Sequence, residues 1–356
     1  MQATTPDSRA SPLLHPALRH SAFAIRHSAF TTVSSVYCFG HVSTGVILRL
    51  KMPYPQPDGY AEVAETLENH AGEATGTALV LARLGVNVTL EGNWIGDTPA
   101  CRRTLEFLGS RGIDVSGLTV KAGYAGVNEV VVSDGHTRTV FGRYIDLLFT
   151  TPQWEPPSLA KIRAARIVSV DPAFGETTLA VARAAKEAGK PLVACDARHD
   201  APLTALADAM IISGELMARE YPDALRSDEA RERLFADYRA RCPGLAIFTS
   251  GSRPLWYGRG DIPGGPGSRR AAHTETHREM TSFPVEVVDS AGAGDSFRGG
   301  LIYGLLQGWS DEDAVRFACA VAALICTTAP GCVHPPTLTQ VRSFLTEHGC
   351  PMPVAP

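Results

Sequence analysis

The sequence predicts an α/β fold in which a doubly wound, mostly parallel sheet carries helices on both faces. From Val36 onward, short apolar runs alternate with longer segments whose apolar residues recur at helical spacing. The short runs are apolar at nearly every position, which is typical of strands buried on both faces of a parallel sheet. The chain has 356 residues, of which 44% are hydrophobic, so it can build one large domain or two small ones.

Six short apolar segments are predicted strands, namely SVYCFGHV, NVTLEGNWI, ARIVSVD, PLVACD, ADAMIIS and LAIFTSG. Four longer segments among them are predicted helices, namely GEATGTALVLARLG, TPACRRTLEFLGSRGI, TTLAVARAAKEAGK and ARERLFADYRARCPG. The first of these segments closes with Gly85, and glycine is common at the position just after the last residue of a helix. Further along, SDEDAVRFACAVAALICTTAPG begins with Ser310 and Asp313 at capping-box spacing and predicts a buried helix.

Three segments depart from this alternation. Asn128–Gly142 contains two alternating runs around Asp134 and Gly135, which predicts a hairpin serving as an edge ribbon or a small lid. Gly258–Glu279 is polar and rich in glycine and proline, so we expect a mobile loop. Residues 1–34 repeat RHSAF and hold a single acid, which favours a disordered or wrongly assigned start over an organelle transit peptide.

The composition excludes several classes of protein. The net charge is −4 and the longest basic cluster, Arg269-Arg270, is too short for a nucleic-acid footprint. No apolar run approaches the ~20 residues needed to span a bilayer. The eight cysteines show no CxxC spacing, so we interpret them as reduced, buried thiols of a cytoplasmic protein, with zinc or disulfides as the weaker alternative.

The chemistry is concentrated in VVDSAGAGDSFRGGL, which predicts a strand, a glycine-rich turn and the start of a helix. The backbone N–H groups of Gly292, Ala293 and Gly294 would form an anion hole at the helix N-terminus. Asp295 would accept the proton of an attacking hydroxyl during phosphoryl transfer, while the N–H groups stabilise the charge on the moving phosphoryl group. The alternative is a capping aspartate at a glycine-rich turn.

DSAGAGDSFRGGLI, together with the sequence that follows it, resembles the C-terminal signature of the PfkB/ribokinase family of carbohydrate kinases. The resemblance covers roughly Val36 to Leu345 and implies a kinase domain over 35–345, a small β lid from about 40–60 and 124–144, and a tail over 346–356. It implies ATP-dependent phosphorylation of a sugar or nucleoside hydroxyl with Mg²⁺, and Asp295 as the general base. It also implies a monovalent-cation (K⁺) loop that starts at Asp289 and includes Ala291. The C-terminal segment is most similar to ketose-kinase-like members.

The nucleotide side of the family pattern matches in part. TSGSRP is similar to the family's TxGxxG, with Thr249 and Gly251 in place and Pro254 replacing the last glycine. The alternative for this segment is an ordinary strand and turn. The family's metal-linked NxxE corresponds to SGELMARE, which offers Ser213 and Glu215 with a leucine where the glutamate is expected. The resemblance places two further nucleotide-site residues at Cys319 and Gly331.

The substrate side departs further from the family. GHVSTG has Gly45 where an aspartate is expected, and AGEATG has Gly72 followed by Gly76 where an asparagine is expected. Because a buried substrate hydroxyl needs a polar partner, these changes imply altered substrate choice. Neighbouring polar residues are candidate replacements, namely His41, Ser43, Thr44, Glu73, Thr75 and Asn93.

Asn128 and Arg143 flank the hairpin, and Arg143 would suit an acidic or phosphorylated sugar. The alternatives are a half-buried strand-end histidine for His41, helix-start residues for Glu73 and Thr75, and a solvated surface arginine for Arg143.

The leading hypothesis is an active sugar kinase that binds a small sugar and ATP, with a homodimer formed through the β lid and no nucleic-acid or membrane partner. Two alternatives stay open: a non-catalytic nucleotide- or metabolite-binding homologue, and a nucleoside kinase of the same superfamily. A Rossmann dehydrogenase is disfavoured because the chain lacks an early GxGxxG with its acidic partner.

Overall fold

A computed structural model describes residues 36–135, 137–145, 150–251, 253–260 and 277–353 of the chain. All of them belong to one unit of the chain, Val33–Pro356. The predicted N-terminal extension and the centre of the predicted polar loop lie outside the described residues.

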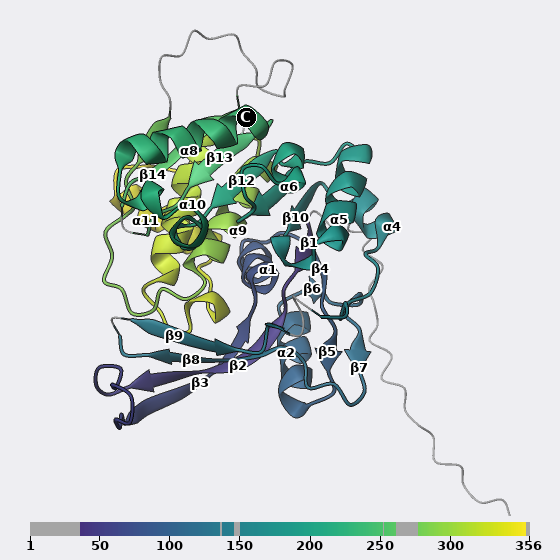
Figure 1. Ribbon diagram of the computed structural model, residues 1–356, viewed down its shortest axis with the longest axis vertical. Helices are drawn as coiled ribbons and strands as arrows, with labels where there is room; N and C mark the ends of the chain where they lie inside the picture. The colour runs from purple at the N-terminus through teal and green to yellow at the C-terminus, as the bar shows by residue number, and fades with distance from the viewer. Residues whose placement is uncertain (1–35, 136, 146–149, 252, 261–276, 354–356) are drawn as a thin grey trace, which may run out of the picture. The chain divides into compact units, whose positions relative to one another are not determined.

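The main sheet has nine strands in the order β15-β14-β13-β12-β11-β10-β1-β4-β6 (Figure 1). Neighbouring strands from β13 to β6 pair in parallel, whereas β14 and β15 add an antiparallel edge. The strands are β1 Val36–Gly40, β4 Val88–Gly92, β6 Ile113–Asp114, β10 Ile167–Val170, β11 Leu192–Cys195, β12 Ala209–Ile212, β13 Leu245–Phe248, β14 Leu255–Arg259 and β15 Arg278–Met280. The predicted doubly wound, mostly parallel sheet is confirmed.

Side chains of the central strands alternate between two hydrophobic cores, one on each face of the sheet. In β1, Val36 and Cys38 join one core, and Tyr37 and Phe39 join the other. Helices from both halves of the chain cover these cores, namely α1 Glu73–Arg83, α2 Pro99–Ser110, α4 Leu159–Ala164, α5 Glu176–Glu187, α6 Pro202–Leu206, α7 Gly214–Glu220, α8 Asp228–Arg241, α9 Ala293–Leu306, α10 Asp311–Ile325 and α11 Leu338–Glu347. Short 3₁₀ turns are η1 Pro172–Phe174, η2 Pro222–Leu225 and η3 Gly331–Val333.

A second sheet has the order β3-β2-β8-β9, and a two-stranded ribbon pairs β5 with β7 (Figure 1). The strands of the second sheet are β2 Ser43–Leu50, β3 Val63–Ala71, β8 Asn128–Ser133 and β9 Arg138–Gly142. The ribbon consists of β5 Ile95–Gly96 and β7 Val120–Lys121. The antiparallel pairing of β8 with β9 is the predicted hairpin. The interval 40–60, expected to enter the lid, contains β2 but stops short of β3. Most of β3 is exposed, so its sequence lacks the apolar alternation that would mark a strand.

The segment Gly258–Glu279 was expected to be one loop, and this is wrong at both ends. Gly258 and Arg259 finish β14, and Arg278 and Glu279 start β15. Cross-strand pairing with buried Trp256 and Tyr257 fixes these polar residues in a strand despite their composition.

The eight cysteines are free thiols. No helix of the described residues is both long and apolar enough to cross a membrane.

Candidate active site

The glycine-rich turn leads into α9 by way of Gly292, which has a left-handed φ of +77° as the residue before the helix. A Cβ at Gly292 would lie 2.7 Å from Cβ of Cys332, so both backbone and packing require glycine there. A Cβ at Gly294 would meet nothing within 4 Å. The N–H of Ala293 reaches Ser290 O at 3.3 Å, whereas the N–H groups of Gly292 and Gly294 have no acceptor in the described part of the chain. The turn therefore presents two unused donors and an open position at a helix N-terminus.

Asp295 follows in the first turn of α9, and its side chain is 24% exposed. Burial raises the pKa of its carboxyl well above the usual range. The positive charge of Arg298 opposes that rise, and the negative charges of Glu73 and Asp171 add to it. A carboxylate with a raised pKa that still contacts solvent can accept a proton from a bound hydroxyl.

Asp171 connects three parts of the structure beneath this turn. Its Oδ1 accepts a hydrogen bond from Arg298 Nη1 at 2.6 Å, and both side chains are almost completely buried, at 1% and 2% exposed. Its Oδ2 accepts from the N–H of His41 at 2.7 Å and from the N–H of Ala74 at 3.0 Å. Asp171 thereby holds the end of β1 and the start of α1 against α9.

Asp289 and Ala291 precede the turn. Asp289 is 8% exposed, and its Oδ1 accepts the N–H of Ala291 at 2.9 Å. Its Oδ2 is buried and has no hydrogen-bond partner in the described residues. An unpartnered buried carboxylate oxygen fits a cation, because such an atom otherwise loses its solvation without compensation.

Three of the predicted nucleotide-site residues and one predicted metal-site residue gather at the carboxyl ends of β12 and β13, which are adjacent parallel strands. Ser213 caps α7 by accepting the N–H of Leu216 at 3.0 Å. Exposed Glu215 follows in the first turn of that helix. Thr249 donates its hydroxyl to Ile212 O at 3.3 Å, and Gly251 has a left-handed φ of +61°.

The same edge holds Asp196, which the sequence pattern did not single out. Asp196 has φ +48°, and its Oδ1 accepts the N–H of Ser213 at 2.7 Å. Two carboxylates, Asp196 and Glu215, thus lie at the sheet edge where α/β proteins bind ligands.

Cys319 and Gly331 lie in packed positions. Cys319 is 6% exposed in α10, and burial raises the pKa of its thiol to about 12. A Cβ at Gly331 would lie 2.6 Å from Ile325 O, so the close approach of η3 to α10 requires glycine.

His41 and Glu73 lie on the substrate side of the turn. Nδ1 of His41 lies 3.3 Å from Oε2 of Glu73, and the His41 ring packs edge-on against Tyr144 at 4.9 Å. Nε2 of His41 is buried and unpartnered in the described residues, while the Glu73 side chain is 53% exposed. Burial lowers the pKa of His41, but the hydrogen bond and charge of Glu73 outweigh it, so the net pKa is raised.

Gly45 pairs with Glu129 across β2 and β8, and a Cβ at Gly45 would lie 2.2 Å from Glu129 O. The Glu129 carboxylate is 8% exposed. It accepts from Asn69 Nδ2 at 2.8 Å, from Ser43 Oγ at 3.4 Å, and from the Tyr144 hydroxyl. A different carboxylate therefore occupies the space beside the position where the family pattern has an aspartate.

Gly72 and Gly76 let α1 approach its neighbours. Gly72 has φ +109°, and its Cβ would lie 2.1 Å from His41 O. A Cβ at Gly76 would lie 2.9 Å from Cβ of Asp295. Gly76 thus adjoins the candidate base.

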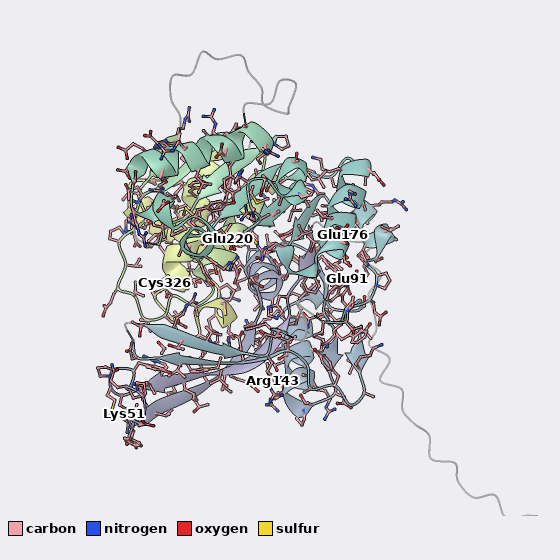
Figure 2. All side chains as sticks on the ribbon, viewed as in Figure 1. Lys51, Glu91, Arg143, Glu176, Glu220 and Cys326 are labelled. Carbon is pink, nitrogen blue, oxygen red and sulfur yellow. The ribbon has the colours of Figure 1, made fainter. Side chains whose placement is uncertain are left out.

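Four other predicted substrate residues remain, and three of them use their side-chain polar groups for contacts within the protein. Asn93 is fully buried and bonds both backbone groups of Val42. Asn128 accepts the Thr44 hydroxyl at 3.0 Å and donates to the carbonyls of 125 and 126. Arg143 is exposed beyond β9 (Figure 2), and its backbone N–H donates to Asn128 O. Thr75 is buried and donates to His41 O at 3.2 Å.

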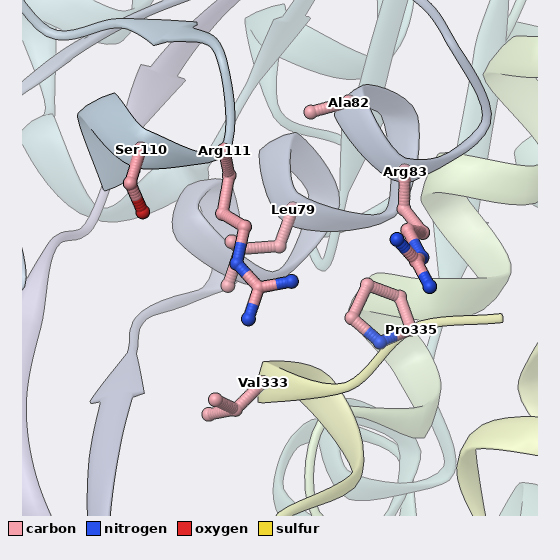
Figure 3. A pocket seen from close by; sticks show the side chains of 7 residues that line it. All are labelled: Leu79, Ala82, Arg83, Ser110, Arg111, Val333 and Pro335. Carbon is pink, nitrogen blue, oxygen red and sulfur yellow. The ribbon is translucent and has the colours of Figure 1, made fainter. Parts of the chain in front are cut away.

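A pocket of about 540 Å³ lies apart from these residues, between α1, the end of α2 and η3 (Figure 3). Its lining consists of Leu79, Ala82, Arg83, Ser110, Arg111, Val333 and Pro335. None of the predicted site residues lines it, so the pocket is separate from the candidate active site.

The sequence patterns missed Asp171, Arg298, Glu129 and Tyr144. A weak signal existed for Arg298, which is a lone arginine in the otherwise apolar run FRGGLIYGLL. Asp171 follows the strand IVSV, and residues at strand ends of parallel sheets often line ligand sites. Glu129 and Tyr144 carried no comparable signal.

The chain is similar to known carbohydrate and nucleoside kinases along most of its length. The profile of the pfkB family carbohydrate kinases matches residues 33–338. An ATP-dependent ribose-1-phosphate kinase of Halopiger xanaduensis is 29% identical over 313 residues, covering 86% of this chain and 97% of its own length. A nucleoside kinase of Methanothermobacter thermautotrophicus is 24% identical, covering 88% and 97%. A solved structure of a ribokinase-like protein from Agrobacterium tumefaciens superposes with a TM-score of 0.74 at 25% identity, covering 88% and 98%.

Proposed function

The chain belongs to the pfkB family of carbohydrate kinases, and from that premise we propose that it transfers the γ-phosphoryl group of ATP to a hydroxyl of a sugar or sugar derivative. The observation that carries the proposal is the position of Asp295, one residue after the open backbone position of Gly294 at the start of α9. In the proposed reaction the acceptor hydroxyl attacks in line, Asp295 takes its proton, and the free N–H groups of the turn stabilise the transferred group.

The proposed nucleotide site follows the carboxyl edge of β12 and β13, at Ser213, Thr249 and Gly251. Asp196 and Glu215 at the same edge would hold Mg²⁺ through its water shell, because Mg²⁺ keeps several waters when phosphates supply its other ligands. Mg²⁺ would supply charge neutralisation at the phosphates. The unpartnered oxygen of Asp289 would hold a monovalent cation beside the turn.

The proposed sugar site lies between the turn and the second sheet, which would act as the lid. Glu73 is the exposed carboxylate of this region and His41 its buried partner, so together they offer one acceptor and one unused ring nitrogen to substrate hydroxyls. The positive charge of Arg138 on β9 lowers the pKa of Asp295, so this lid arginine is a candidate for the substrate side of the turn.

A homodimer through the lid is also proposed. The face of the second sheet opposite Gly45 and Glu129 carries Val46, Leu48, Val130, Val132 and Phe141 by strand alternation. Phe141 is 53% exposed, and apolar side chains gathered on one sheet face favour association. Sedimentation of the wild type and of Phe141→Asp tests this.

The function is tested by incubating the purified chain with ATP, Mg²⁺ and K⁺ and a panel of ketoses, aldoses, sugar phosphates and nucleosides, with ADP release as the readout. We expect release to require one class of acceptor. Release with nucleosides alone would replace the sugar-kinase assignment with the nucleoside-kinase one. ATP binding without ADP release for any acceptor would favour the non-catalytic alternative.

Gly292→Ala and Gly294→Ala are expected to fail in different ways. Gly292→Ala combines a left-handed backbone with a Cβ contact at 2.7 Å, so it should destabilise the fold by about 1–3 kcal/mol. Gly294→Ala meets open space, so its stability should be unchanged or higher, while turnover falls because the methyl group enters the phosphoryl position. Gly109→Ala in α2 also meets nothing within 4 Å and serves as the control with normal turnover. Full activity of Gly294→Ala would contradict the anion-hole assignment.

Glu73→Gln is expected to lower the pKa of His41, because burial then acts without its acidic partner. In the wild type the raised pKa of His41 makes the pair's contribution to stability complete below the usual histidine pKa. That contribution is lost as the pH rises through the pKa that His41 has in the folded protein. The pKa of Glu73 is lowered in the folded protein, so the contribution is also lost as the pH falls through this folded pKa of Glu73.

Histidine NMR titration measures the effect of this substitution, and the KM for sugar should rise in parallel. Glu176→Gln is the control, because Glu176 begins α5 as Glu73 begins α1. An unchanged His41 titration in Glu73→Gln would contradict the pairing.

A further inference from the structure

Arg298 is a charged side chain inside the packed face of α9, one turn after Asp295, and it is 2% exposed. Its Nη1 donates to Asp171 Oδ1 at 2.6 Å and its Nε to Thr77 Oγ1 at 2.8 Å. Its Nη2 has no hydrogen-bond partner in the described part of the chain and lies 3.8 Å from Asp295 Oδ1. A buried donor left without an acceptor is costly. The chain therefore keeps two N–H groups unsatisfied beside the candidate base.

The guanidinium group is fixed from three sides. Asp171 follows β10, Thr77 lies on α1, and the thiol of Cys195 at the end of β11 accepts from Nη1 at 3.0 Å. Thr77 Oγ1 also lies 3.2 Å from the backbone carbonyl of Asp295. Because the planar guanidinium is held by its other donors, Nη2 is fixed at 3.8 Å from Asp295 Oδ1.

We propose that Arg298 is a positioning residue for phosphoryl transfer, which keeps Asp295 ionised and turned toward the acceptor hydroxyl through Nη2. This inference rests on the proposed function, in which Asp295 is the base. Neutral residues in place of both Arg298 and Asp171 would pack at lower cost, since neither a buried charge nor an unsatisfied buried donor would remain. The arginine is therefore explained by the charge it brings to Asp295.

The charged and titratable groups that face Asp295 come from four other elements besides α9. They are Glu73 on α1, Asp171 after β10, Arg138 on β9 and Cys332 on η3. Both acids favour the protonated form of Asp295, and both arginines favour the carboxylate. Arg298 is the buried arginine of the two, so solvent screens its charge less. Loss of its charge should shift the protonation of Asp295 to higher pH.

The test follows the side-chain carboxyl of Asp295 by ¹³C NMR over pH, with Asp295→Asn identifying its signal. In Arg298→Met the titration midpoint should rise by about one pH unit or more. The acid limb of kcat should rise with it, because the base must be deprotonated. Arg298→Lys keeps the charge but loses the fork, so its midpoint should rise less, while kcat falls and the KM for ATP stays unchanged.

Arg316→Met is the matched control, because Asp313 and Arg316 form the same i, i+3 pair in the first turns of α10. It should leave the Asp295 titration unchanged. If Arg298→Met fails to fold, Arg298→Lys decides. An unchanged Asp295 titration in folded Arg298→Met, or a wild-type kcat in folded Arg298→Lys, would overturn the proposal. The NMR titration needs no turnover, so it tests the coupling of Arg298 to Asp295 separately from the kinase assignment. A shifted midpoint would establish the coupling even if no acceptor were phosphorylated, and the missing phosphorylation would overturn the kinase assignment alone.

Discussion

Asp295→Asn is expected to lower kcat by about 10²- to 10⁴-fold, the range that general-base catalysis supplies. The substitution keeps the size of the side chain and removes its ability to accept the hydroxyl proton. The KM for ATP should change little, because the proposed nucleotide site lies on β12 and β13. Coupled ADP detection with the acceptor found in the panel measures the effect.

The stability of this variant should be equal to that of the wild type or higher. Burial raises the pKa of Asp295, so its ionised form at neutral pH costs the folded state free energy that the asparagine does not cost. Asp313→Asn is the matched control, because both aspartates are the third residue of their helices. Asp313→Asn should keep its turnover. Unchanged kcat in Asp295→Asn would remove Asp295 from the mechanism.

The sequence predicted the main sheet well because each parallel strand is a short apolar run between helices. In β1, four successive side chains enter two different cores, which forces every position to be apolar. Most of β3 is exposed on both faces, so nothing in its pattern marked it as a strand. Its place in the second sheet comes from pairing with β2, a contact that only the folded chain shows.

The candidate site was predicted where the chemistry is local in sequence and missed where it depends on distant pairs. The turn around Asp295 is contiguous, so its pattern alone located it. Arg298 and Asp171 are 127 positions apart, and neither position carries a repeat or motif that connects them. In the sequence pattern, Gly45 leaves a gap in the substrate site where an aspartate is expected. The structure shows that Glu129, from another strand, fills the space beside it.

Asp171→Asn is expected to destabilise the fold by about 3–5 kcal/mol, the usual cost of breaking a buried ion pair from one side. The change leaves the guanidinium of Arg298 charged and 2% exposed without its partner at 2.6 Å. Urea unfolding measures the loss. Asp223→Asn is the control, since its pair with Arg226 is 87% and 77% exposed and should have no measurable effect.

The double variant Asp171→Asn with Arg298→Met separates stability from catalysis. It removes both buried charges, so it should be less destabilised than the sum of the single variants. It should not recover kcat, because Asp295 still lacks the arginine that favours its ionised form. Recovery of both stability and kcat would show that the buried pair serves the fold alone. Recovery of stability without kcat would show that the chain retains a costly buried charge for the sake of Asp295.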